Sequence, residues 1–155
     1  MAQKTMTDLL LMTMQDLHYA ERQILKALPK LAKASDSEEL KDALLHHREE
    51  TQGQVERLQK AFDALGKRTR GQQTCEPING LIEEGDEIVG LACAQAVEHY
   101  EMARYGTIIA WAKAAGANDV SKLMQETLEE EKKADATLNQ LATRGLNELA
   151  VKQAA

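Results

Sequence analysis

Residues 67–86, KRTRGQQTCEPINGLIEEGD, form the one long stretch of this chain that lacks the hydrophobic spacing of a helix. The stretch contains three glycines and Pro77, which favour loops, and a short helical turn is predicted near Leu81 and Ile82. An extended residue covers roughly 3.3 Å, so this segment is long enough to cross a helical bundle from end to end. It therefore divides the chain into two halves and predicts a crossover between them.

Each half of the chain predicts a helical hairpin. Apolar residues recur at alternating steps of four and three, which places them on one face of a helix, and strong helix formers dominate the composition. Short connections inside each half imply antiparallel neighbours, and a long link between two hairpins is the ferritin-like arrangement. The predicted fold is an all-α, ferritin-like antiparallel four-helix bundle, forming a single domain over residues 1–155. Its helices are predicted over about 7–34, 36–65, 86–115 and 119–150.

Composition and charge limit the partners of this chain of 155 residues. The formal net charge is −6, and the one basic cluster is Lys67, Arg68 and Arg70, so no nucleic-acid partner is expected. Cys75 and Cys93 form no CxxC motif, which indicates reduced thiols in a cytoplasmic protein. No apolar stretch is long enough to span a bilayer, so no membrane partner is expected.

Four glutamates interrupt the apolar stripes, one in each predicted helix: Glu21, Glu50, Glu98 and Glu131. Burying an ionised carboxylate costs several kcal/mol unless the group is paired or bound to a metal. Their recurrence in both halves indicates one shared site at the centre of the bundle. The alternative is a set of solvated glutamates, since most charged residues on helices face water.

The two halves can be superposed with an offset of about 80 residues. Glu21 and Glu50 are 29 positions apart, and Glu101 and Glu131 are 30 positions apart, so each half supplies a similar pair of acids. Asp135 lies four residues after Glu131 and therefore on the same helix face. The superposition adds Glu101 and Asp135 to the candidate site.

Carboxylates with one imidazole suit Fe(II) or Mn(II) better than structural zinc, which prefers Cys and His. We therefore predict two metal ions, iron first and manganese second, roughly 3.5–4 Å apart. Asp135 is either a ligand or a neighbour of one, and His47 is either a ligand or a core histidine bonded to Glu50. The predicted ligand set is Glu21, Glu50, Glu98, Glu101, Glu131, Asp135 and His47.

Segments spread over nearly the whole chain carry a family resemblance. They read DLHYAE at 16–21, HREETQGQV at 47–55, GLIEEG at 80–85, VEHYE at 97–101 and EEEKKAD at 129–135, with Tyr105-Gly106 after the fourth. They resemble the YciE/YciF-like stress-protein family of the ferritin-like, rubrerythrin-related superfamily. The resemblance implies a four-helix bundle with a di-metal centre, a homodimer and a role in bacterial stress responses. It implies no defined activity and no particular redox partner.

One departure from the superfamily pattern concerns the histidines. Ferritin-like di-iron sites carry Glu-x-x-His on two helices, but Gly53 and Ala134 stand where those histidines would fall. The first hypothesis is a cytosolic di-metal protein of stress response that handles oxygen, peroxide or metal. The alternatives are a cage-type iron store or mini-ferritin, and a non-catalytic bundle with a polar core of the acids, Tyr105, His47 and Gln54. The sequence leaves open whether the protein is an enzyme.

Overall fold

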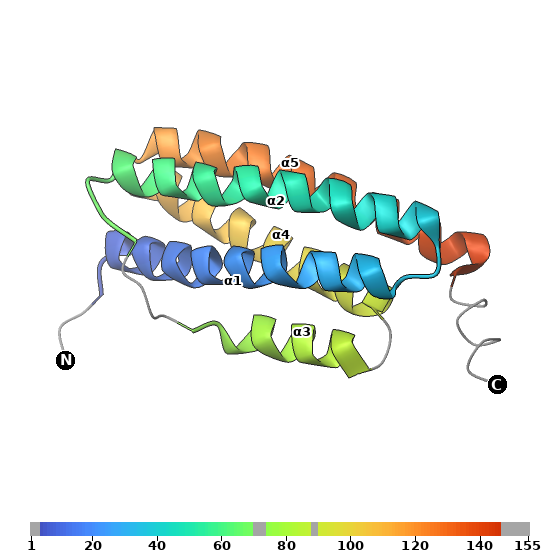
Figure 1. Ribbon diagram of the computed structural model, residues 1–155. Helices are drawn as coiled ribbons and strands as arrows, with labels where there is room; N and C mark the ends of the chain where they lie inside the picture. The colour runs from blue at the N-terminus through green and yellow to red at the C-terminus, as the bar shows by residue number, and fades with distance from the viewer. Residues whose placement is uncertain (1–3, 70–73, 88–89, 147–155) are drawn as a thin grey trace.

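The computed structural model describes residues 4–69, 74–87 and 90–146, and all the regular structure in these ranges is helical. Figure 1 shows four long helices side by side, with a shorter helix lying along the outside of the bundle. In the bundle, α1 packs against α2 and α4, and α5 packs against the same two helices. The helices are α1 (Met6–Ala34), α2 (Glu38–Ala64), α3 (Glu76–Glu87), α4 (Gly90–Ala114) and α5 (Asn118–Leu141), followed by a π-helical turn (Ala142–Leu146).

The predicted bundle topology is confirmed. Neighbouring helices run antiparallel within each hairpin, and α2 ends at the opposite end of the bundle from the start of α4 (Figure 1). The segment between them therefore runs the length of the bundle, as expected for two hairpins joined by a crossover. None of the helices in the described ranges is long and apolar enough to cross a membrane.

The crossover is more helical than the sequence predicts. A short turn was expected near Leu81 and Ile82, but α3 is 12 residues long. Pro77 occupies the second position of this helix, where its missing N–H group leaves no hydrogen bond unmade. Ile78 is fully buried, and Leu81 and Ile82 pack partly buried against the core. These three apolar residues lie on one face of α3. This face packs α3 against α1 and α4.

The helix ends follow from local chemistry. Thr5 and Asp8 form a capping box at the start of α1. Gly116 has a φ of 74° in the short α4–α5 connection, a conformation that favours glycine. Gly145 has a φ of 98° and breaks the helix that was predicted to reach residue 150. Residues 147–150 of that predicted helix, like Arg70 of the basic cluster, lie outside the described ranges.

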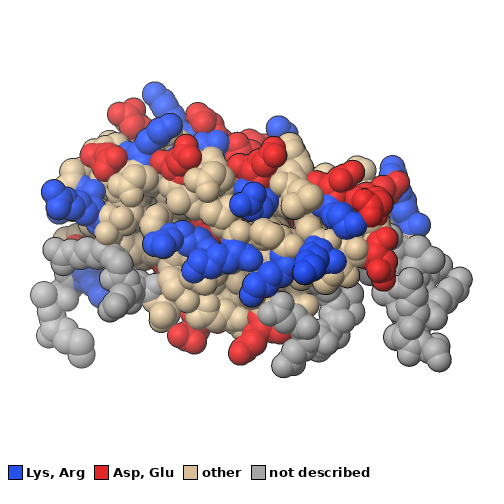
Figure 2. Space-filling view, in the orientation of Figure 1, with Lys and Arg blue, Asp and Glu red and all other residues tan. Residues whose placement is uncertain are grey.

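Charged side chains on the outside contrast with those at the centre of the bundle. Figure 2 shows acidic and basic side chains interspersed on one face, with Lys and Arg in a row across its middle. Such exposed charges are solvated and contribute little to stability. The core between the helices is built from apolar side chains such as Leu10, Met14, Leu17, Leu58 and Phe62, all fully buried. Glutamates in this core therefore need a separate explanation.

Candidate metal centre

The centre of the bundle holds one group of buried ionisable side chains. Glu21 from α1, Glu101 from α4 and Glu131 from α5 are fully buried, and Glu98 of α4 is 2% exposed. His47 of α2 is 6% exposed, so each of the four bundle helices contributes to the group. Glu98 and Glu101 are three residues apart on one helix face, which explains why both point inward.

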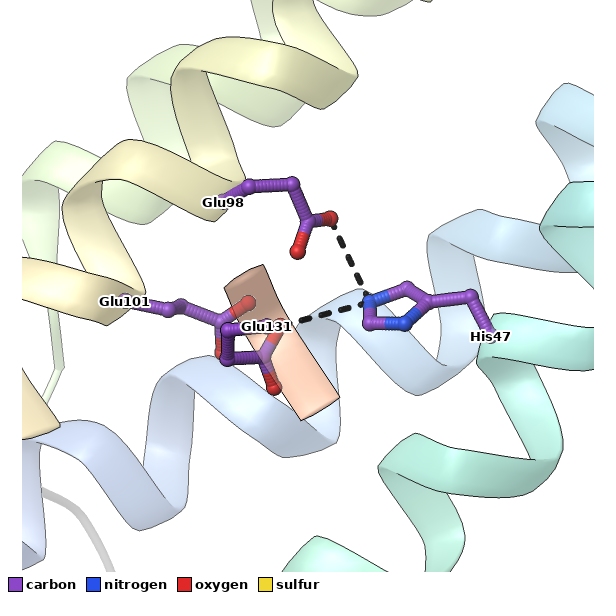
Figure 3. Close-up of side chains that lie close together, drawn as sticks. All are labelled: His47, Glu98, Glu101 and Glu131. Carbon is purple, nitrogen blue, oxygen red and sulfur yellow. Dashed lines mark ion pairs between the residues drawn. The ribbon is translucent and has the colours of Figure 1, made fainter. Parts of the chain in front are cut away.

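Four of these side chains form a compact set of possible metal ligands. One ligand atom each from His47, Glu98, Glu101 and Glu131 lies within 4.8 Å of the other three (Figure 3). The Nε2 atom of His47 is 3.3 Å from Glu98 Oε1 and 3.8 Å from Glu131 Oε2. We call these four residues the carboxylate–histidine cluster; its ligand atoms are placed closely enough to hold a metal ion.

The carboxylate oxygens of the cluster lack hydrogen-bond partners. Among the described residues, no hydrogen bond reaches Glu98 Oε2, either oxygen of Glu101 or either oxygen of Glu131, although Glu131 Oε2 faces His47 Nε2 at 3.8 Å. A buried polar atom without a partner costs about 1–3 kcal/mol, and more when it is charged. As ionised carboxylates, these oxygens cannot satisfy one another, because each is only a hydrogen-bond acceptor. They fit a bound cation, which would satisfy several of them at once.

Burial controls the protonation of the carboxylates. It raises the pKa of Glu101 and of Glu131 well above the usual value, and the neighbouring glutamates push both further in the same direction. Burial also raises the pKa of Glu21 from 4.5 to about 7, although a hydrogen bond from Tyr105 opposes the change. These carboxylates therefore bind protons more tightly than exposed glutamates do, and a metal would have to displace any protons that they hold.

His47 connects the cluster to Glu50. Its Nδ1 atom is 3.4 Å from Glu50 Oε2, while Nε2 faces the carboxylates. A carboxylate on one ring nitrogen fixes the orientation of the ring and leaves the other nitrogen free for a metal. Burial alone would lower the pKa of His47, but the charges of Glu98 and Glu131 and the hydrogen bond with Glu50 raise it. His47 thus contacts Glu50 and at the same time faces the carboxylates of the cluster.

Three predicted ligands lie outside the cluster: the fully buried Glu21, and Glu50 and Asp135 nearer the surface. The side chain of Glu50 is 22% exposed and lies on the outer side of His47, where it also approaches His46 Nε2 at 3.5 Å. The side chain of Asp135 is also 22% exposed, and its Oδ1 is 3.3 Å from Nε2 of the exposed His99. Both side chains thus lie between the buried cluster and the surface.

A polar network that the sequence did not indicate ties α2 to α5 beside the cluster. Arg57 binds Glu130 with two hydrogen bonds, of 3.0 Å from Nη1 and 2.8 Å from Nη2. The buried Gln54 donates to the same carboxylate at 3.1 Å. Glu130 immediately precedes Glu131, so the network fixes the helix turn that positions a cluster residue. No hydrophobic periodicity marks a pair of this kind, because Arg57 and Glu130 are both only partly buried.

A cavity leads to the cluster between α2 and α5. Its volume is about 270 Å³, and five of its ten lining residues are ionisable. His46, Glu50 and Lys133 lie on its outer part, since each has an exposed or half-exposed side chain, and the buried His47 and Glu98 line its inner part. Ala134, which stands where a superfamily histidine would fall, also lines it. We call this cavity the polar pocket; it offers ions and polar solutes a route to the cluster.

Tyr105 supports Glu21 from inside the core. Its buried hydroxyl donates a hydrogen bond to Glu21 Oε1. We expect Tyr105→Phe to destabilise the protein by about 1–3 kcal/mol in urea unfolding, because a buried acceptor loses its partner. Tyr19→Phe is the matched control, since Tyr19 donates to Asn79 at a half-buried site and its loss should cost less. Equal losses in the two variants would contradict the supporting role of Tyr105.

The fold and the site together define a ferritin-like helical-bundle protein with a buried cluster that could hold a metal ion. The chain belongs to the family described as Domain of unknown function (DUF892), whose model matches residues 5–151. It is 37% identical to Protein YciF of Escherichia coli (strain K12) over 166 residues, covering 99% of this chain and 100% of that protein.

Solved structures agree with this assignment. The crystal structure of the E. coli stress protein YciF superposes with a TM-score of 0.88 at 37% identity, covering 94% of this chain and 99% of that chain. YcfI of Rhodopseudomonas palustris, provisionally called a structural protein, superposes with a TM-score of 0.84 at 46% identity, covering 88% and 94%. A protein of Xanthomonas campestris pv. campestris, with 22% identity, a TM-score of 0.76 and coverage of 95% and 94%, shares the fold.

Proposed function

We propose that this protein binds two divalent metal ions, iron or manganese, at the carboxylate–histidine cluster together with Glu21. The observation that carries the proposal is the set of buried carboxylate oxygens without hydrogen-bond partners, on Glu21, Glu98, Glu101 and Glu131. Protein interiors seldom leave such atoms unpaired, and each instance calls for a specific cause. A metal site is the cause that accounts for all of them together.

Charge balance supports two ions. Glu21, Glu98, Glu101 and Glu131 carry four negative charges when ionised, and two divalent cations offset them. Neutral His47 would add one nitrogen donor through Nε2, and hard oxygen donors with one imidazole suit Fe(II) and Mn(II). Glu50 would orient His47, and Tyr105 would orient Glu21. When bound, such ions supply redox chemistry with dioxygen or peroxide, or a means of holding the metal itself.

The physiological setting is part of the proposal. E. coli YciF is called a stress protein, and the shared family supports a role for this chain in a bacterial stress response. Both cysteines are free thiols in the structure, which supports a cytoplasmic location. A homodimer, expected from the family resemblance, completes the proposal.

Metal-dependent stability tests the proposal. A metal bound only by the folded protein stabilises it by RT ln(1 + [metal]/Kd), about 2.7 kcal/mol at a hundredfold excess over Kd. We expect the melting temperature to fall after treatment with a chelator and to recover when Mn(II), or Fe(II) under anaerobic conditions, is added. The Glu131→Gln variant is the control, and its melting temperature should not respond to metal. An unchanged wild-type melting temperature under all these conditions would contradict the proposal.

A further inference from the structure

Glu98 lies between two pockets of opposite chemistry. On one side is the polar pocket between α2 and α5. On the other is a pocket between α1, α3 and α4, which we call the apolar pocket; among the described residues, Glu98 alone lines both pockets. The apolar pocket is formed mainly by side chains such as Ile24, Leu28, Ile82 and Ala94, and Glu98 is its one charged lining residue.

The apolar pocket is suited to a small non-polar molecule. Its volume is about 30 Å³, whereas a single water needs roughly 10–15 Å³ and two to four polar partners. The lining side chains provide only the carboxylate of Glu98 and the thiol of Cys93 as polar groups. Water is therefore poorly stabilised in this space, and apolar cavities of this kind take up non-polar guests.

The crossover helix covers the apolar pocket. Leu81, Ile82 and Gly85 of α3 line it, and a Cβ atom on Gly85 would lie only 3.2 Å from Cys93 Cβ. The missing side chain therefore lets α3 lie close to α4. The crossover helix therefore does more than connect the hairpins, because it forms one wall of an apolar space directly beside a proposed metal ligand.

We infer that the apolar pocket is a binding site for dioxygen beside Glu98, separate from the polar route. The choice of dioxygen rests on the proposed metal function, since it is the small non-polar molecule with which Fe(II) or Mn(II) reacts. The polar pocket would then serve ions and polar oxidants such as peroxide. The existence of the dioxygen site does not depend on bound metal, and it is therefore tested in its absence.

The test uses metal-free protein under dioxygen pressure, with nitrogen at the same pressure as the diamagnetic control. Dioxygen is paramagnetic and speeds the NMR relaxation of nearby methyl groups. We expect several-fold greater enhancement for the methyl groups of Ile24 and Leu28, which are 3% and 4% exposed, than for those of Leu10 and Met14, which are fully buried farther along α1. Equal enhancement at both groups of methyls would overturn the inference.

Two substitutions of the same kind separate the pockets. Ala94→Leu fills the apolar pocket and should remove the enhancement at Ile24 and Leu28, whereas Ala43→Leu fills part of the polar pocket and should leave it intact. Ala27→Val replaces Ala94→Leu if circular dichroism shows that the latter fails to fold. Enhancement that persists in the filled variant would overturn the inference. Because no metal is present, this outcome is independent of the proposed metal function.

Discussion

Glu21→Gln is expected to make the metal-free protein about 3 kcal/mol more stable at about pH 8. Burial raises the pKa of Glu21 from 4.5 to about 7, and each pKa unit corresponds to about 1.4 kcal/mol. Above the folded-state pKa, the wild-type protein must keep an ionised carboxylate in its core. Glutamine keeps an oxygen that accepts the hydrogen bond of Tyr105, but it carries no charge.

The advantage of the variant should disappear in acid. Below about pH 4.5, Glu21 is protonated in both the folded and the unfolded state and contributes no difference. Between that pH and about 7, the folded state holds the proton more tightly, so wild-type stability falls as pH rises. Urea unfolding at about pH 4 and pH 8, with chelator present, measures the effect. Glu56→Gln, at an exposed position, should show little change, and a variant less stable than wild type at pH 8 would contradict the argument.

Metal should reverse this dependence on pH. The raised pKa values of Glu101, Glu131 and His47 act in the same direction as that of Glu21, so the metal-free protein weakens as pH rises. A metal needs deprotonated carboxylates and neutral imidazole, so its affinity increases over the same range. The buried carboxylates of the proposed site therefore lower the stability of the metal-free protein at high pH, and the same carboxylates would bind the metal.

Glu98→Ala and Glu131→Ala are each expected to remove most of the bound metal. Each change deletes a buried carboxylate with at least one unpaired oxygen and leaves fewer donors around the ions. Metal content per chain, measured by plasma mass spectrometry on protein purified from the same culture conditions, gives the result. Glu49→Ala is the matched control, because Glu49 is an exposed glutamate of α2 that belongs neither to the cluster nor to the lining of the polar pocket.

Glu50→Ala should give an intermediate result. Glu50 contacts His47 Nδ1 and lies outside the cluster, so its loss acts through the orientation of the imidazole. Removing a partner of this kind typically weakens metal affinity by about 10- to 100-fold.

Unchanged metal content in both Glu98→Ala and Glu131→Ala would show that these residues do not hold the metal.

Periodicity predicted the bundle, but it did not rank the acids correctly by depth. The pattern placed Glu50 in an apolar stripe and added Glu101 only through the superposition of the halves, yet Glu101 is fully buried and Glu50 is 22% exposed. The difference arises because α4 packs against α1, α3 and α5, whereas α2 contacts only α1 and α5. A helix with three neighbours buries a wider face, and this face includes residues beside the stripe.

Other features depend on contacts between distant segments. The crossover is helical because α3 packs its apolar side chains against α1 and α4. Local sequence patterns do not reveal contacts with such distant segments. The inward turn of His47 depends on Glu50 at one ring nitrogen and Glu98 at the other. In contrast, the spacing of Glu98 and Glu101 already placed both on one helix face. The sequence thus predicted the buried residues of the candidate site more accurately than the partly exposed residues around it.

The most direct test of the metal centre is an anomalous-scattering map from crystals of protein loaded with Mn(II) or Fe(II). The account predicts two peaks, roughly 3.5–4 Å apart, among the carboxylates of Glu21, Glu98, Glu101 and Glu131 and next to His47 Nε2. A map with no peak between these side chains, from protein shown to be exposed to excess metal, would contradict the central claim.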